Sequence, residues 1–381
     1  MTSGNAAERG YGPLPEHLHA FQEALLLQCF SGEALDVSRL AHRDNAGLVI
    51  TAKRGNLRPG EALSQVYRVG RHLQRTGFEQ PMLLDAARYS GANRVNAQAP
   101  FDGTWISRQR ELGLPVLTDS GYIGEGDEAG LRSILSRAAE LKDAIALLPL
   151  HLSWLRSATA RETLVSRVEE AGVPVAVVLE YASDPLSLKN VVPSLLRLLT
   201  CSVPVMLLRC DVSALGALCT GALAAAVGTS TSLRHLYPIT DGGGGGAQEA
   251  QIAAIVRECL SYISVDKIAL AAQADPDDML WQCACESCRT RPLSMLAIHP
   301  WPDQARLAFC HSLETLLDLR DHLLPPGSTA ASRIESWRAL CQNAQFRHLD
   351  VESTTDKWDP PAFLGRWLDA LEPATLQERV R

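Results

Sequence analysis

Three cysteines stand close together in one short segment of the chain. Residues 281–289 read Trp-Gln-Cys-Ala-Cys-Glu-Ser-Cys-Arg, which places Cys283, Cys285 and Cys288 in a C-x-C-x₂-C array. Three thiolates on one tight turn repel each other unless a soft cation lies between them, and tetrahedral Zn²⁺ suits such a donor set best. The spacing therefore predicts a metal site.

The fourth ligand must come from another segment. His311 follows Cys288 by about two dozen residues and flanks the apolar face of a predicted helix, from which it can point back at the cysteine turn. His299, Cys310 and His322 are the competing candidates. Four protein donors leave no position open for water, so we expect one structural zinc ion per chain.

Polar side chains at the ends of apolar runs are the second chemical feature. They are Asp85, Asp119, His151, Glu180, Asp211, Arg234 and His235. One acid at such a place is often only a helix N-cap. A ring of them is expected where the carboxyl ends of barrel strands carry an active site.

Short runs rich in Val, Ile and Leu predict the strands that position these side chains. The runs are 48–51, 82–85, 115–119, 145–148, 175–180, 205–209, 223–228 and 265–271. Helical periodicity appears between them, as at Leu131, Ile134 and Leu135, and again over residues 252–263. This alternation predicts an α/β protein with a (β/α)₈ TIM barrel. An open doubly wound sheet is the alternative, but no G-x-G-x-x-G follows the first run.

The expected domain scheme has four parts. Residues 1–20 form a flexible tail, 21–274 the barrel, 275–325 a zinc-binding subdomain with a closing helix, and 326–381 a C-terminal helical extension. Five consecutive glycines, 242–246, follow Asp241 and indicate a linker or lid rather than a fixed phosphate cradle.

Composition narrows the class of protein. The chain is 46% hydrophobic and 21% charged, which excludes a disordered or collagen-like protein. Its net charge of −7 requires any nucleic-acid contact to come from a local basic face. The first residues hold no apolar signal segment, and most cysteines have apolar neighbours, so we expect reduced thiols, a cytoplasmic location and no membrane partner.

A second motif, taken with the cysteine array, resembles the tRNA-guanine transglycosylase family. Residues 117–122 read Leu-Thr-Asp-Ser-Gly-Tyr, similar to the Leu-Thr-Asp-Ser-Gly-Gly-Phe/Tyr signature of that family, and the metal motif follows later in the same order. The likeness runs from about residue 48 to residue 322. It implies that Asp119 is catalytic and handles a proton on the base, with Ser120, Gly121 and Tyr122 in the base pocket.

The resemblance also implies a reaction. Members of the family exchange a guanine in a nucleic acid for a 7-deazaguanine, through an aspartate that holds the ribose covalently. The chain departs from the family where Tyr122 replaces a glycine, and it lacks the family's nucleophile motif Asp-x-x-x-Pro-Thr-Arg; the nearest stretch, 227–235, has Arg234 but no acid. Asp211 is our first choice for the nucleophile, with Asp85, Glu180 and Asp241 behind it.

Two functions therefore stay open. The chain is either a pentosyltransferase acting on tRNA or DNA, in a divergent branch such as the DNA-modifying deazapurine relatives, or a non-catalytic subunit that positions a nucleic acid or a catalytic partner. An unrelated barrel hydrolase is a third reading. An acid facing Asp119 across the pocket favours the enzyme. Arg289 and Arg291, with Arg306 and Arg234, are the expected nucleic-acid contacts. A homodimer and a heteromeric partner are both compatible with the resemblance.

Overall fold

The computed structural model of the chain describes residues 12–53, 58–239, 251–356 and 358–372. The chain divides into two compact units, Met1–Ile239 and Thr240–Arg381. Among the helices that the structure describes, none is both long enough and apolar enough to span a bilayer.

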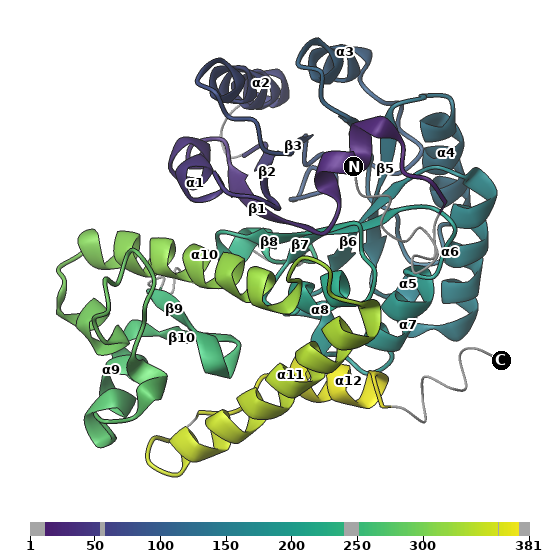
Figure 1. Ribbon diagram of the computed structural model, residues 1–381. Coiled ribbons are helices and arrows are strands. Elements are labelled where there is room, and N and C mark those ends of the chain that lie inside the picture. The colour runs from purple at the N-terminus through teal and green to yellow at the C-terminus, as the bar shows by residue number, and fades with distance from the viewer. Residues whose placement is uncertain (1–11, 54–57, 240–250, 357, 373–381) are drawn as a thin grey trace. The chain divides into compact units, whose positions relative to one another are not determined.

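Eight parallel strands form the sheet of the first unit, in the order β3-β2-β1-β8-β7-β6-β5-β4 (Figure 1). They are β1 (Ala24–Phe30), β2 (Ala46–Thr51), β3 (Met82–Asp85), β4 (Val116–Leu117), β5 (Ala144–His151), β6 (Val175–Glu180), β7 (Val205–Cys210) and β8 (Ala224–Gly228). In the described part of the chain every neighbouring pair shares a ladder, and β3 and β4 stand at the two ends of the order. The sheet is a nearly closed barrel, which confirms the predicted TIM-like α/β class.

The strands are mostly apolar, and all but the last residues of β1 and β5 are buried, because side chains on both faces are covered. One face lines the barrel: a single core cluster takes residues from all eight strands, including Leu26, Val49, Leu83, Leu117, Leu147, Val178, Leu208 and Ala226. Leu18 and Phe21 of the short helix η2 (Glu16–Phe21) join the same cluster. Because η2 immediately precedes β1, these two side chains close the barrel at the amino ends of its strands.

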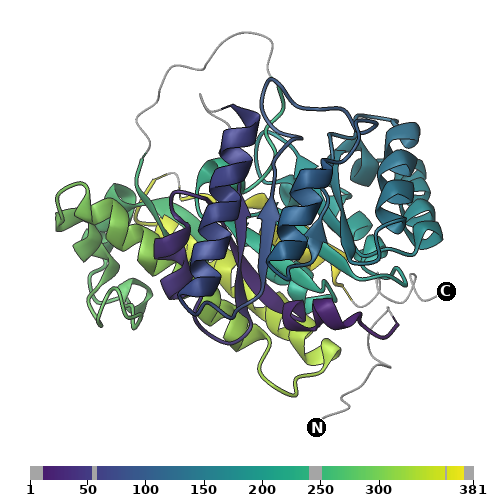
Figure 2. The same ribbon diagram turned by 90° about the horizontal axis from the view of Figure 1, so that it is seen from above.

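Helices cover the outer face of the barrel (Figure 1, Figure 2). They are α1 (Ala34–Leu40), α2 (Pro59–Arg75), α3 (Gly103–Glu111), α4 (Glu128–Ala139), α5 (Ser153–Arg156), α6 (Ala158–Ala171), α7 (Val191–Leu198) and α8 (Ala214–Cys219). The predicted helical face at Leu131, Ile134 and Leu135 is the buried face of α4. Side chains cap several helices: Asp102 accepts the N–H groups of Thr104 and Trp105 at the start of α3.

Two predicted elements are wrong. The run 265–271 lies in helix α9 (Val265–Ala274), where Ser264 caps the start and Val265, Ile268 and Ala272 are buried at helical spacing. The predicted helix over 252–263 is instead an antiparallel hairpin of β9 (Ala253–Val256) and β10 (Ser261–Ser264). Short apolar runs satisfy both periods, so periodicity alone could not separate these cases. The missing eighth strand is β1, and the barrel strands end at Gly228, well before residue 274.

The second unit consists of the hairpin, helix α9 and three further helices. They are α10 (Asp303–Leu323), α11 (Ala330–Glu352) and α12 (Ala362–Ala370), with short turns η5 (Arg257–Cys259), η6 (Met279–Trp281) and η7 (Leu293–Ile298). The hairpin, α9 and the cysteine segment share one core, in which Trp281 packs edge-on against Trp358 with ring centroids 5.9 Å apart. Helices α11 and α12 pack through Trp337 and Trp367, also 5.9 Å apart.

Candidate functional site

The acids that the sequence places at strand ends lie at the carboxyl end of the barrel. Asp85 is the last residue of β3 and Glu180 the last of β6, while Asp119 stands two residues after β4 and Asp211 directly after β7. Parallel strands bring these ends to one side of the sheet. Asp241, and the glycines 242–246, lie outside the described residues.

Asp119 is engaged by the loop that connects β3 to α3, residues 86–102. Its side chain is fully buried, both carboxylate oxygens accept the backbone N–H of Asp102 at 3.1–3.2 Å, and Arg88 forms an ion pair with it. The group that faces Asp119 is therefore a guanidinium of the same chain and not Asp211 or Glu180. A buried carboxylate needs such a partner, because an unpaired charge out of water is costly.

Gly121 is required by the same loop. A Cβ at this position would lie 1.9 Å from the backbone oxygen of Asn96. The Tyr122 N–H donates to Val95 O at 2.8 Å, and the buried Ser120 hydroxyl bonds that of Thr118 at 2.8 Å. The resemblance places Gly121 in a base pocket, whereas in the structure the 86–102 loop lies against Gly121.

The loop is also tied to the end of β6. Arg94 forms an ion pair with Glu180, and its guanidinium carbon lies 3.5 Å from the centroid of the Tyr122 ring. The Tyr122 hydroxyl donates to Glu180. Burial and the Glu180 carboxylate raise the pKa of this hydroxyl. Arg88 and Arg94 thus fasten the 86–102 loop at the ends of β4 and β6, two contacts that sequence reasoning missed.

Asp85 lies in a buried polar network. It accepts from the Tyr89 hydroxyl at 2.7 Å and the Ala87 N–H at 2.8 Å, and Gln28 and Thr51 donate to it at 3.3 Å. Arg209, held at a left-handed φ of 52°, approaches to 3.8 Å. With its side chain fully buried and its oxygens satisfied, Asp85 has a structural role in this state of the chain.

Asp211 has a different environment from the other three acids. Its side chain is 27% exposed, and its nearest recorded cation is Arg234, 4.0 Å away. Burial, followed by the nearby Asp211 carboxylate, raises the pKa of Asp184 from 3.8 to about 7. Burial also lowers the pKa of His235, so its ring is neutral near pH 7. The loops after β6, β7 and β8 therefore hold an accessible carboxylate, an acid with a high pKa and an arginine.

Asp184 was missed because it stands four residues beyond the end of β6. It accepts the Leu186 N–H at 2.9 Å at the start of the short helix η3 (Pro185–Ser187) and lines a cavity of about 10 Å³ together with Arg209 and Cys210. His151, at the end of β5, bonds the Ser153 hydroxyl at 2.8 Å and takes no part in this group.

The second unit brings the predicted metal ligands together. The Sγ atoms of Cys283, Cys285 and Cys288 lie 3.3, 3.4 and 3.4 Å from His311 Nδ1. All four donor atoms fall within 4.8 Å of one another. A tetrahedral ion with bonds of about 2.3 Å to sulfur and about 2.0 Å to nitrogen separates these atoms by about 3.5 Å. The donor set and its spacing thus fit a four-coordinate metal ion.

Neighbouring groups orient the ligands. His311 Nε2 lies 2.8 Å from Ile255 O, so it carries the proton and leaves Nδ1 free for a metal. The Cys288 N–H donates to Cys285 Sγ at 3.4 Å, and Arg289 and Thr290 take left-handed φ values of 53° and 63° that close the turn. His299, Cys310 and His322 are not in the group of donors.

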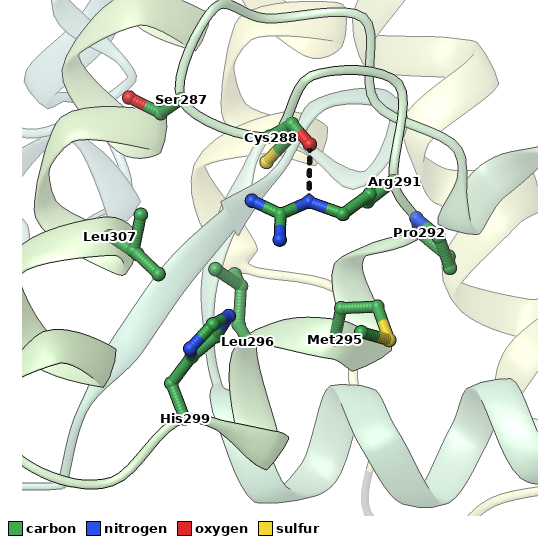
Figure 3. A pocket seen from close by; sticks show the side chains of 8 residues that line it. All are labelled: Ser287, Cys288, Arg291, Pro292, Met295, Leu296, His299 and Leu307. Atoms are coloured by element: carbon green, nitrogen blue, oxygen red, sulfur yellow. Dashed lines mark hydrogen bonds between the residues drawn. The ribbon is translucent and has the colours of Figure 1, made fainter.

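Arg289 and Arg291, the expected nucleic-acid contacts, are both exposed on the cysteine turn. The Arg291 Nε–H donates to Cys288 O at 3.0 Å, which fixes the guanidinium beside the metal ligands. In Figure 3 this guanidinium and the ring of His299 both point into a small hollow that Leu296 and Leu307 also line.

Comparison with known proteins gives no match to a family model or to a curated protein. Among solved structures, the chain is similar to the crystal structure of the enoyl reductase domain of MlnA from the macrolactin biosynthesis cluster from Bacillus amyloliquefaciens. The identity is 12% over 93% of this chain and 95% of that chain, with a TM-score of 0.30. A likeness of this degree carries no argument about function.

Proposed function

We propose that the chain is a transglycosylase-like enzyme that exchanges a guanine in a nucleic acid for a 7-deazaguanine base through an aspartyl-glycosyl intermediate. The observation that carries the proposal is the pair of carboxylates after β6 and β7. Asp211 is accessible beside Arg234, while Asp184 has a pKa of about 7. A two-step glycosyl transfer uses one carboxylate as the nucleophile and a second carboxyl group that can give up and take back a proton near neutral pH.

The two residues divide the reaction between them. The Asp211 carboxylate attacks C1′ of the sugar, the C1′–N9 bond breaks, and its electron pair stays on the leaving guanine, which takes the proton of Asp184. In the second step the ionised Asp184 removes the proton from N9 of the incoming base. That nitrogen attacks C1′ and Asp211 leaves as a carboxylate. A pKa near 7 lets Asp184 act as acid and then as base at neutral pH.

Asp119 and its neighbours reach the substrate only after the 86–102 loop moves. Asp119 is paired with Arg88, and Asn96 covers Gly121. When the loop is displaced, Asp119 accepts from the base edge, with Ser120, Gly121 and Tyr122 around it, as the resemblance implies. Arg88 is 18% exposed and also donates to Pro100 O at 3.0 Å, so displacement of the loop breaks both of its contacts and exposes the Asp119 carboxylate.

The metal is proposed to be one structural zinc ion. Cys283, Cys285, Cys288 and His311 would hold it, and the closed donor set supplies stability to the second unit rather than a reactive position. The nucleic acid, tRNA or DNA, is proposed to contact the exposed Arg289 and Arg291. A cytoplasmic location also remains part of the proposal.

Exchange of labelled guanine into tRNA and into duplex DNA tests the enzyme directly. Asp211→Asn should abolish exchange and the covalent protein–nucleic-acid adduct. Asp184→Asn should lower exchange by about 10²–10⁴-fold, the usual loss for a general acid or base. Asp36→Asn is the matched control, because Asp36 is 76% exposed on α1 and, among the described residues, its one ion pair is with Arg39. Normal exchange by Asp211→Asn would exclude Asp211 as the nucleophile.

A non-catalytic positioning subunit is the second candidate. It is favoured by one observation: Asp119 and Glu180 are both engaged by arginines of the chain's own loop. This candidate predicts nucleic-acid binding without exchange or adduct for any deazaguanine offered. It also predicts that the Arg88→Gln variant shows no base exchange. The enzyme proposal predicts instead that this variant exchanges bases with a changed KM for the base.

A further inference from the structure

One tryptophan differs from all the others in the chain. Of the seven tryptophans, six are 0–2% exposed; they are Trp105, Trp154, Trp281, Trp337, Trp358 and Trp367. Trp301, in the segment between η7 and α10 of the second unit, is 75% exposed. Leaving a large aromatic ring in water forgoes the stabilisation that burial gives, but one exposed ring is ordinary on a protein surface, so it indicates a binding partner only together with the groups around it.

Basic groups lie in the same segment as Trp301. The Arg306 N–H donates to Pro302 O at 3.1 Å, which places Arg306 one helical turn beyond the tryptophan. Its side chain is exposed, with no ion-pair partner among the residues that the structure describes. His299 precedes Trp301 by two residues and faces Arg291 across the hollow of Figure 3.

The hollow itself is shallow. Its volume is about 10 Å³. That space holds about one water molecule or one phosphate oxygen, and no aromatic ring. Arg291 is held there by its Nε–H bond to Cys288 O at 3.0 Å, so its terminal N–H groups stay available to a ligand. The nearby Glu314 carboxylate is bonded by the N–H and the hydroxyl of Ser287, at 3.0 and 2.7 Å.

An exposed ring and two exposed arginines, for which the described part of the chain shows no ion pair, are the kinds of group that bind unpaired bases. Bases of every type stack on an aromatic face, while arginines contact the phosphates between them. A base within a duplex cannot offer its face, because both faces are stacked on neighbouring bases. The combination therefore favours a single strand or loop over a double helix.

We propose that Trp301, Arg291 and Arg306 form a binding site for a single-stranded nucleic acid, with one base stacked on Trp301 and phosphates on the two arginines. The proposed site specifies that the bound nucleic acid is single-stranded. The choice of a nucleic acid as the partner rests on the proposed function. It adds Trp301, a residue that no motif of the sequence singled out.

Fluorescence gives a direct test, because Trp301 is the accessible tryptophan of the seven. Acrylamide should quench this one residue in the full chain, and an oligothymidylate of about 12 nucleotides, within the usual range of site sizes, should protect it. Trp301→Ala should weaken binding roughly 5- to 150-fold, the typical range for loss of one stacked base. Trp301→Phe should restore most of the affinity. Arg291→Gln should reduce the salt dependence of binding by about one phosphate contact.

Phe346→Ala is the control, because Phe346 is another exposed aromatic residue of the second unit, 61% exposed on α11. Equal affinity of the Trp301→Ala and wild-type proteins overturns the proposal. Protection of Trp301 that rises with protein concentration alone also overturns it, since the patch is then an interface between protein molecules. Base exchange that is independent of Trp301 refutes this site alone; Trp301-dependent binding without exchange refutes only the catalytic proposal.

Discussion

Replacing Cys285 by Ser removes one of the four metal donors with the smallest change in shape. Cys285 Sγ lies 3.4 Å from His311 Nδ1 and also accepts the Cys288 N–H at 3.4 Å. A serine hydroxyl keeps an acceptor at this place, but at neutral pH it is a far weaker ligand for a soft ion than a thiolate.

The magnitude follows from the role of the cluster in the second unit. Cys285 and Cys288 are buried in the same core as Trp281, Leu293 and Leu296, so metal binding and folding of this core are coupled. Binding of zinc to a structural site contributes about 10–16 kcal/mol, of which one donor in four represents about 3 kcal/mol. A loss of that size lowers the Tm of a unit this large by roughly 10 °C.

Metal analysis and thermal unfolding check the result in the same samples. Wild-type protein should contain about one zinc ion per chain and lose stability in a chelator, whereas Cys285→Ser should contain little metal and respond weakly to chelator. Cys259→Ser is the control, because Cys259 is fully buried in the same core but is not a donor. Undiminished metal in Cys285→Ser, or none in the wild type, would contradict the assignment.

Two further predictions concern the barrel. The raised pKa of Asp184 means that the folded state keeps a proton that the unfolded state releases above about pH 4, so stability should fall as pH rises from about 4 to about 7. Asp184→Asn should flatten this dependence by roughly 1–3 kcal/mol in urea unfolding at pH 5 and pH 8, and an unchanged difference between the two pH values would refute the shift. Gly121→Ala should destabilise the barrel by about 1–3 kcal/mol, because its Cβ would meet Asn96 O at 1.9 Å. Gly60→Ala on α2, where no atom lies within 4 Å, should be neutral or slightly stabilising, and similar losses in both variants would argue against the loop contact.

The sequence predicted the class of fold but misplaced one strand. Seven of the eight predicted runs overlap barrel strands, whereas 265–271 is part of α9 and β1 was missed. Residues Ala24–Phe30 are apolar except for Gln28 and carry a strand signal as strong as the others. The short run at 265–271 could not be separated from a helix, because its buried residues fit either period over so few positions.

The sequence predicted the metal ligands more completely than the surroundings of the acids at the strand ends. Their spacing was enough to group the three cysteines. His311 was selected over the competing candidates by its position on the buried side of α10, which only the folded structure shows. The predicted strand ends gave the positions of the acids at the carboxyl end of the barrel. Their partners could not be read from the sequence, because Arg88 and Arg94 lie in an irregular loop whose path is set by contacts far along the chain.

Trapping a covalent adduct tests the central claim most directly. Wild-type protein is incubated with tRNA or DNA and a labelled deazaguanine, denatured, and analysed for protein linked to nucleic acid, beside Asp211→Asn and the Asp36→Asn control. The account predicts an adduct and base exchange in the wild type and the control, and neither in Asp211→Asn. An adduct that persists in Asp211→Asn, or wild-type protein that binds nucleic acid but gives neither adduct nor exchange, would contradict it.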